Sequence, residues 1–422
     1  MSDAPLRILV VPPMYGGSLP IAGYCAAALR GLGHTVCVFD APQFHAGFSA
    51  LRALQVEGAR LEHLEKSFLR VVGQAVGALA DSFAPDLVLA LAQAPLDRMA
   101  LEKLRRDNVP AVMWFVEDYK VFAYWRVFAP LYTAFAVIQR EPFLSALAAA
   151  GQPNALYLPL AADPVFHAPA RLAAAEREEY GADIAFVGAG YPNRRRAFRA
   201  LRDKDFKIWG SDWHGEESLA AHIQRGGARI SPEDCVKIYT ATHVNLNLHS
   251  SVQARELVPA GDFVNPRTFE LAAIGAFQLV DKRGLMPELF AEDELATFGS
   301  LEEMLRRTEW FLAHPEEREA FARRGQARVL REHTYTHRMQ ALLEFLQERL
   351  PDFGVRRRTV ERLPADMPPL LREELAACLD AMQLPPDVPF AEVAERLRRQ
   401  ERPLSELECG ILFLDAWRAQ YR

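Results

Sequence analysis

The chain has 422 residues, 50% of them hydrophobic and 25% charged, which predicts a globular protein of two domains with an appendage. Its 49 Lys and Arg residues and 55 Asp and Glu residues give a net charge of -6, without the basic stripe that nucleic-acid binding requires. The five cysteines are dispersed, no signal-peptide core follows the start, and no apolar run has the ~18 residues of a membrane span, so we expect a soluble, cytoplasmic protein without disulfides.

The first third of the chain alternates apolar runs of strand length with helical stretches. Runs at 8–11 and 36–39 flank a Pro/Gly loop and a helical stretch, which is the pattern of a β-α-β unit. Further strands are expected at 87–91, 111–116 and 134–138. This alternation predicts a parallel, doubly wound sheet.

A second α/β unit is expected to begin with the apolar run at 184–187. Its later strands are expected at 206–209, 244–248 and 276–280. Before the last of them, Asn265 and Pro266 begin a short helix that Gly275 ends, because Asn is a good N-cap, Pro fits the first helical position and Gly fits the end.

The last part of the chain is expected to be helical. Residues 301–349 have the apolar spacing of two amphipathic helices that pack across both domains. From about residue 351 we expect a small helical appendage. Residues 404–417 carry an apolar stripe at near-helical spacing, which either docks on its own domain or binds a partner or a second copy.

Polar residues follow the first strand of the second unit, where the carboxyl end of a parallel strand opens into a crevice. Gly188 and Gly190 come first, then Asn193, Arg194 and Arg195. Backbone N–H groups and guanidinium groups at this place indicate an anion site. The alternatives are an ordinary strand-to-helix turn and a solvated helix end.

Further candidates lie at the next strand and at the short helix. His249 follows the strand at 244–248, and a neutral imidazole there is able to donate to a phosphate or a sugar hydroxyl. Arg267 and Thr268 are placed to present a side chain and an N–H group to phosphates, and Asn265 is either a further contact or only the N-cap. A purely structural role is the alternative for His249.

The first unit offers candidates at the corresponding edge. Gly16 and Gly17 follow its first strand and could reach a ligand across a cleft, or form a tight turn. Glu117 and Asp118 follow a later strand, and Asp118 is the candidate to deprotonate or orient an acceptor hydroxyl, or else to cap a helix. The D-x-D triplet at 203–205 precedes a strand in a polar connection, so we expect no metal site there.

Six ordered motifs together resemble the CgeB-like family, within the glycosyltransferases of two-domain GT-B architecture. They are "GGSLPIAGYCAAALRGLGHTVCVF" from residue 16, "WFVEDY" at 114–119, "YLPLAADPVFH" at 157–167, "FVGAGYPNRR" at 186–195, "NPRTFELAAIGAFQLVD" at 265–281 and "HPEEREAFARRGQARVLREHTYTHR" at 314–338. The resemblance covers residues 5–347 and leaves the tail outside.

The resemblance implies an α/β fold in which two Rossmann-like, doubly wound domains face a cleft. Residues 1–165 would form the acceptor-side domain and residues 166–350 the nucleotide-sugar domain, with its last helices free to cross back to the first. Residues 351–422 would form the helical tail.

The resemblance also implies a hexosyltransferase-like enzyme that moves a sugar from a nucleoside-diphosphate donor to a hydroxyl of a protein or glycan, without a metal ion. A UDP-sugar is the expected donor. Arg194 and Arg195 would neutralise its diphosphate, and Glu270 would accept hydrogen bonds from its ribose hydroxyls. Retention and inversion both stay open. The alternatives are a nucleotide-sugar epimerase of the same fold and a non-catalytic interaction protein.

Overall fold

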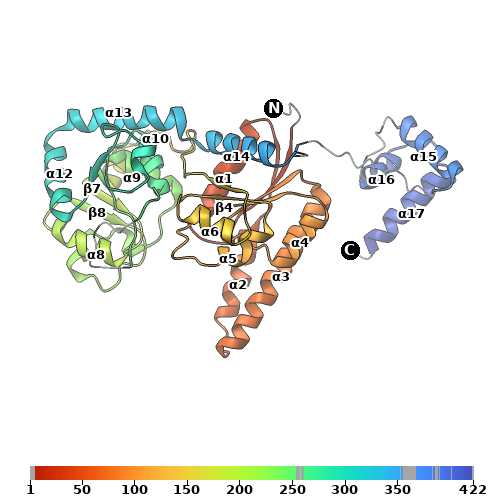
Figure 1. Ribbon diagram of the computed structural model, residues 1–422, viewed down its shortest axis with the longest axis horizontal. Helices are drawn as coiled ribbons and strands as arrows, with labels where there is room; N and C mark the ends of the chain where they lie inside the picture. The colour runs from red at the N-terminus through yellow and green to blue at the C-terminus, as the bar shows by residue number, and fades with distance from the viewer. Residues whose placement is uncertain are drawn as a thin grey trace. The chain divides into compact units, whose positions relative to one another are not determined.

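The computed structural model describes residues 5–252, 257, 261–351, 353–354, 367–382, 384, 388, 390–400 and 402–420. The chain divides into a first unit that ends at Pro351 and a second unit that begins at Asp352. The first unit holds two lobes, each built on its own parallel sheet (Figure 1). We call them the N-lobe, which contains strands β1 to β6, and the C-lobe, which contains strands β7 to β11.

The N-lobe sheet has the order β2-β1-β3-β4-β5-β6, and every neighbouring pair is parallel. Its strands are β1 (Arg7–Val11), β2 (Thr35–Val38), β3 (Leu87–Leu91), β4 (Ala111–Phe115), β5 (Ala134–Val137) and β6 (Ala155–Tyr157). Its helices are α1 (Leu19–Gly31), α2 (His45–Arg52), α3 (Gly58–Phe83), α4 (Arg98–Arg106), α5 (Trp125–Phe128) and α6 (Phe143–Ala149). The winding changes direction between β1 and β3, so the crevice at their carboxyl ends is where this type of sheet binds ligands.

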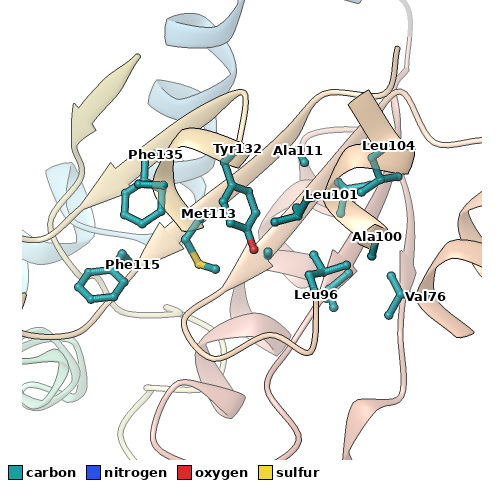
Figure 2. Close-up of a cluster of buried hydrophobic side chains, with 14 of the residues drawn as sticks. Val76, Leu96, Ala100, Leu101, Leu104, Ala111, Met113, Phe115, Tyr132 and Phe135 are labelled. Carbon is teal, nitrogen blue, oxygen red and sulfur yellow. The ribbon is translucent and has the colours of Figure 1, made fainter. Parts of the chain in front are cut away.

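The N-lobe core lies between the sheet and its helices. All residues of β3 and β4 are buried, as expected for central parallel strands that helices cover on both faces. Figure 2 shows Leu101 and Leu104 of α4 in the same buried cluster as Met113 of β4. Asp97 caps the start of helix α4, and its side chain accepts a hydrogen bond from the Ala100 N–H (2.9 Å). The apolar residues that predicted these strands and helices are therefore also the residues that pack in the core.

The C-lobe sheet has the order β11-β10-β9-β7-β8 and is also fully parallel. Its strands are β7 (Ala182–Val187), β8 (Phe206–Trp209), β9 (Thr242–Asn247), β10 (Gln278–Asp281) and β11 (Ala296–Phe298). Its helices are α7 (Ala174–Tyr180), α8 (Pro192–Phe198), α9 (Pro232–Ala241), α10 (Pro266–Ile274), α11 (Met286–Leu289), α12 (Leu301–Ala313) and α13 (Pro315–Glu332). Here the winding changes direction between β7 and β9. The predicted pair of doubly wound sheets is confirmed.

Residues 301–349 form three helices where the apolar pattern predicted two. Helix α12 ends at Ala313, and Pro315 starts α13 at once. Helix α14 (Tyr335–Arg349) begins after Thr334, whose side chain caps it. The periodic pattern missed these breaks because the apolar positions continue across both of them, whereas Pro and Thr at helix starts set the boundaries.

Two crossover segments connect the lobes and lie side by side. Ala162 of the first crossover donates its N–H to the His333 carbonyl (3.0 Å), and its own carbonyl accepts from the Tyr335 N–H (3.0 Å). The Arg338 guanidinium donates to the carbonyls of Pro159 (2.7 Å) and Leu160 (3.2 Å). Helix α14 then packs on α1 of the N-lobe, so the chain returns to the lobe where it started (Figure 1).

The second unit is helical in its described part. It contains α15 (Pro369–Ala381), α16 (Phe390–Arg398) and α17 (Glu406–Gln420), with a core of its own that includes Leu379, Val393, Leu397 and Ile411. Across the described residues of the whole chain, no helix combines the length and the apolar character needed to cross a membrane.

Candidate functional site

The glycine loop after β7 packs against the loop after β8. The Gly188 N–H donates to the Trp209 carbonyl (2.8 Å) and the Gly190 N–H to the Ser211 carbonyl (2.9 Å). A side chain at Gly190 would collide with the Asp212 carbonyl oxygen. The structure therefore gives both glycines a different role from the expected anion cradle, since their N–H groups bind protein carbonyls and their small size permits the close packing.

Arg194 spans the point where the winding of the C-lobe sheet changes direction. Its Nε and Nη2 donate to the Leu248 carbonyl after β9 (3.0 and 2.8 Å), and its Nη1 donates to the Ala189 carbonyl after β7 (3.0 Å). The side chain is 6% exposed. Burial, with the repulsion of nearby Arg267, lowers the pKa of Arg194 to about 9.

Arg267 lies beside Arg194 from the first turn of α10. Its Nε donates to the Tyr239 hydroxyl (3.1 Å), and its guanidinium carbon lies 5.4 Å from the centre of the Phe186 ring. Arg194 contacts the same ring at 4.9 Å. The Nη2 atom of Arg267 would be 3.2 Å from a Cβ placed on Gly188, so this guanidinium lies directly against the glycine loop.

Neither of these two arginines forms an ion pair with a carboxylate in the described part of the chain. Asp281 acts from beyond salt-bridge distance and only partly offsets the lowering of the Arg194 pKa. For Arg267, the Tyr239 hydroxyl and then Glu270 outweigh burial and raise the pKa. Two cations side by side without an anion between them are electrostatically unfavourable. The arrangement is therefore suited to bind a polyanion.

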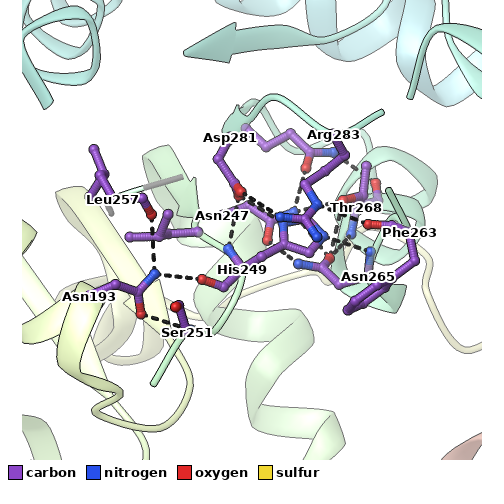
Figure 3. A network of polar contacts seen from close by, with 12 residues as sticks. Asn193, Asn247, His249, Ser251, Leu257, Phe263, Asn265, Thr268, Asp281 and Arg283 are labelled. Carbon is purple, nitrogen blue, oxygen red and sulfur yellow. Dashed lines mark hydrogen bonds and ion pairs between the residues drawn. The ribbon is translucent and has the colours of Figure 1, made fainter. Parts of the chain in front are cut away.

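The N-terminus of α10 is fixed by a buried network of amides and hydroxyls (Figure 3). The Asn265 side chain accepts from the Thr268 N–H (3.0 Å) and donates to Asn247 Oδ1 (2.9 Å). Asn247 in turn donates to Thr268 Oγ1 (2.9 Å) and to Gln278 Oε1 (3.0 Å). Of the two alternatives for Asn265, the structure shows the N-cap, and the Thr268 N–H, expected to face phosphates, is the group that this cap binds.

His249 belongs to the same network. Its Nδ1 donates to Asp281 Oδ1 (2.7 Å), and its Nε2 accepts from the Asn265 N–H (2.9 Å). Burial lowers the pKa of His249, although Asp281 opposes this, so the imidazole is neutral. The structure therefore replaces the expected donor to a phosphate or sugar with a buried residue that supports the loop before α10.

Asn193 and Arg195 also have partners other than those expected. Asn193 is fully buried, donates to the His249 carbonyl (2.8 Å) and accepts from the Ser251 N–H (3.0 Å), so it holds the loop after β9. Arg195 donates to the carbonyls of Gly190 (2.7 Å) and His214 (2.7 Å). These contacts support the loops around the two buried arginines.

Glu270 lies one turn after Arg267 on the same face of α10. Its Oε1 is 3.9 Å from His167 Nε2, and its side chain is 22% exposed. Burial and the negative charge of Glu270 raise the pKa of Tyr24, which belongs to α1 of the N-lobe. Glu270 thus faces the junction of the two lobes, close to the basic pair.

The N-lobe contributes the loop that contains Gly16 and Gly17. Arg229 of the C-lobe donates to the Gly16 carbonyl (3.4 Å) and lies 4.8 Å from the centre of the Tyr15 ring. A Cβ at either glycine would meet no atom within 4 Å. This loop therefore lies against the C-lobe, and space is open beside both glycines.

The two carboxylates after β4 have different surroundings. Asp118 Oδ1 accepts from the Lys120 N–H (2.9 Å) and organises a turn. Glu117 is partly buried and accepts from the Tyr124 hydroxyl (2.8 Å) and from the Gln93 amide. Burial raises the pKa of Glu117 despite these hydrogen bonds.

Gln93, Gln139 and Asp262 lie beside the candidate residues, and the sequence patterns did not indicate them. Gln93 has a left-handed backbone (φ 64°) at the end of β3, a strained conformation that is common at functional sites. Gln139 bonds to Asp262 across the lobes (2.8 Å). A signal for Gln139 was available, because it is a polar residue two positions after the end of a buried strand, as Glu117 is.

A metal site needs several ligating side chains close together. In the described ranges, no three His, Cys, Asp or Glu side chains come together as they would in a metal site. The D-x-D triplet at 203–205 lies between α8 and β8, and its Asp205 accepts from the Asp183 N–H (3.0 Å).

Comparisons with known proteins agree with this architecture. A family model described as "Glycosyl transferase-like" matches residues 172–344. The chain is 23% identical over 253 residues to the spore protein CgeB of Bacillus subtilis. The aligned region covers 57% of this chain and 77% of CgeB.

Two solved structures share the fold at low sequence identity. Sucrose-phosphate synthase of Thermosynechococcus elongatus matches with a TM-score of 0.56 at 13% identity, over 82% of this chain and all (100%) of that one. HepE of Anabaena, solved with UDP and glucose, matches with a TM-score of 0.55 at 12% identity, over 81% of this chain and 100% of its own. The chain therefore has the GT-B fold, carries a glycosyl transferase-like domain and resembles CgeB.

Proposed function

We propose that this protein transfers a sugar from a nucleoside-diphosphate sugar, with UDP as the nucleotide, to a hydroxyl group of a protein or glycan. The observation that carries the proposal is the pair Arg194 and Arg267 at the carboxyl edge of the C-lobe sheet. Both cations are at least partly buried, they repel each other, and the described residues supply no carboxylate to pair with them. A diphosphate supplies the missing negative charge.

The same two cations suit the chemical step. In transfer, the bond between the anomeric carbon and the diphosphate oxygen breaks, and a bond from that carbon to the acceptor oxygen forms. Negative charge then develops on the leaving diphosphate, where fixed guanidinium groups stabilise it with little reorganisation. The proposal assigns this charge neutralisation to the protein and requires no metal ion.

Glu270 is the proposed contact to the ribose of the donor. Its carboxylate is partly exposed, lies one turn from Arg267 and faces the lobe junction. A carboxylate accepts hydrogen bonds from paired hydroxyl groups well. The choice of UDP is supported by HepE, which shares the fold and was solved with that nucleotide.

Glu117 and Asp118 are the proposed acceptor-side carboxylates. The acceptor hydroxyl loses its proton during transfer, and a carboxylate whose pKa is raised accepts a proton more readily. Burial raises the pKa of Glu117, so we assign the proton-accepting role to it and the shaping of the turn to Asp118.

The test is UDP binding by the Arg267→Gln variant. The substitution removes one of two cations, so we expect the Kd for UDP to rise at least about tenfold, which corresponds to about 1.4 kcal/mol. Isothermal titration calorimetry measures this change, and thermal unfolding confirms that the variant is folded. The control is Arg196→Gln, which alters an exposed arginine of α8 and should bind UDP like the wild type.

Product analysis of the wild-type protein completes the test. Incubation with a panel of UDP-sugars and candidate acceptors should release UDP and yield a glycosylated acceptor. A UDP-sugar with an altered sugar and no free UDP would show an epimerase instead. Unchanged UDP affinity in Arg267→Gln would overturn the assignment of the diphosphate site.

A further inference from the structure

Gln139 links the two lobes at the point where their candidate catalytic loops meet. It follows β5 of the N-lobe and is 1% exposed. Its Oε1 accepts from the Tyr119 N–H (3.1 Å), and its Nε2 donates to Asp262 Oδ1 of the C-lobe (2.8 Å). Both ends of one buried amide are therefore engaged, each by a different lobe.

These two partners fix the orientation of the amide. A backbone N–H only donates, so the Gln139 oxygen must face Tyr119. An ionised carboxylate only accepts, so the Gln139 nitrogen must face Asp262. Neither bond survives if the amide is reversed.

On the N-lobe side, the bond holds the acceptor-side loop. Tyr119 directly follows Glu117 and Asp118, and its ring stacks on Phe143 with centroids 4.4 Å apart. The Tyr119 carbonyl accepts from the Trp125 indole N–H (3.2 Å). The hydrogen bond from the Tyr119 N–H to Gln139 is therefore one of several contacts that hold the residue next to the two carboxylates in place.

On the C-lobe side, the bond reaches the loop that leads into α10. The Asp262 carbonyl accepts from the Leu285 N–H (2.9 Å), and Arg283 Nε donates to the Phe263 carbonyl (3.1 Å). Asp281 lies behind Arg283, with an Oδ2 to Nη1 distance of 3.7 Å. These hydrogen bonds hold the loop in place. A contact at Asp262 therefore also acts on the start of α10, where Arg267 lies.

The electrostatic effects on Arg283 also indicate that loops of the two lobes lie close together. Burial lowers the pKa of Arg283, and three carboxylates oppose this: Asp281, Asp262 and Asp118. Asp118 belongs to the N-lobe, so its loop lies within electrostatic range of a C-lobe guanidinium. The acceptor-side loop and the loop before α10 thus face each other around Gln139.

We propose that Gln139 is a positioning residue that aligns the acceptor-side loop (residues 117–119) with the donor-side loop (residues 261–265) when the lobes meet. The inference rests on the proposed function. Its physical basis is that transfer is sensitive to the separation of acceptor and donor, so that a small misplacement lowers the rate strongly. UDP binding, in contrast, uses C-lobe residues and does not require this alignment.

The test compares Gln139→Met with Arg140→Met. Methionine keeps the length of the side chain and removes both hydrogen bonds. Arg140 is the matched control, because the adjacent residue also contacts the C-lobe, through an exposed ion pair with Glu288 (2.9 Å), but touches neither loop. We expect kcat for transfer to fall at least about tenfold in Gln139→Met, with the Kd for UDP within about twofold of wild type. Arg140→Met should match the wild type in both.

A second variant gives a readout that a merely structural role would not produce. In Gln139→Glu the new carboxyl group keeps the bond from Tyr119 but faces the Asp262 carboxylate. Two carboxylates at this distance favour sharing one proton, so the activity of this variant relative to wild type should rise as the pH falls from 8 to 5.5. A constant ratio over this range contradicts the proposal.

Hydrogen exchange tests the inference without any activity. In Gln139→Met, peptides that cover residues 117–121 and 261–265 should both exchange faster than in the wild type, and in Arg140→Met neither should. Unchanged exchange in both peptides would overturn the positioning role. If instead both change but the wild type neither binds nor turns over any UDP-sugar, the proposed function fails while the link between the loops stands.

Discussion

Glu117 combines the two properties that a proton acceptor needs at the residue scale. It is partly buried, which raises the pKa of its carboxyl group, and Tyr124 and Gln93 hold it in one orientation. The carboxylate accepts a proton only when ionised, so the raised pKa moves the acid limb of the activity profile to higher pH than an ordinary glutamate would give.

We therefore expect Glu117→Gln to lower kcat for transfer by about 100-fold and to remove the acid limb of the kcat/KM profile between pH 4.5 and 8. Steady-state assays across this range measure both effects. The control is Glu102→Gln, which alters an exposed carboxylate on α4 and should keep the wild-type profile. Persistence of the acid limb in Glu117→Gln would show that another group accepts the proton.

At this scale the sequence predicted where residues lie in the fold better than it predicted their hydrogen-bond partners. It indicated Arg194 because it follows a strand, Arg267 because it begins a capped helix, and Glu270 through the family resemblance. It did not predict that Arg194 spans two strand ends while Arg195 binds neighbouring loop carbonyls. Adjacent residues on a first helical turn point in different directions, and only the surrounding loops decide which of them is buried.

At the scale of elements, the crossover segments depend on one buried histidine. His333 Nε2 donates to the Leu289 carbonyl (2.8 Å), and its Nδ1 accepts from Arg338 (2.7 Å). Protonation would place a proton where Arg338 now donates. Burial, with the positive charge of Arg338, accordingly lowers the pKa of His333 to about 4.

This lowered pKa predicts how stability depends on pH. Between pH 6.5 and about 4, the unfolded chain binds a proton at His333 that the folded chain does not, so the free energy of unfolding falls as the pH falls. The full contribution is about 3 kcal/mol. Urea unfolding at several pH values should show a shallower fall in His333→Gln, and an unchanged one in His243→Gln, which alters an exposed histidine. Equal slopes in all three proteins would contradict this account.

The elements themselves were predictable where local signals agreed. Asn265, Pro266 and Gly275 correctly indicated α10, since cap, first turn and end each have a residue preference. The breaks between α12, α13 and α14 were missed, because the apolar period alone carried the prediction across them. The contacts between the crossovers join residues about 170 positions apart, and no local pattern encodes such a pairing.

At the scale of the whole molecule, the lobes divide the proposed work. The C-lobe supplies the basic pair and Glu270, and the N-lobe supplies Glu117 and Asp118. The fold and this division followed from strand order and from the family resemblance. The bond between Gln139 and Asp262 did not, because the orientation of one lobe on the other is set by loops whose meeting no sequence rule describes.

The second unit gives the last prediction. Its described helices have a hydrophobic core of their own, which includes Leu379 and Leu397. The family model likewise ends at residue 344.

Removal of residues 355–422 should therefore leave the Kd for UDP and the release of UDP from a UDP-sugar within about twofold of the full chain, a change of less than about 0.5 kcal/mol. Calorimetry and a UDP-release assay measure the two quantities. If the truncated protein keeps both and loses only transfer to the acceptor, the tail recruits that acceptor. If it aggregates or loses UDP binding, the tail instead completes the fold of the lobes, and the independence argued here is wrong.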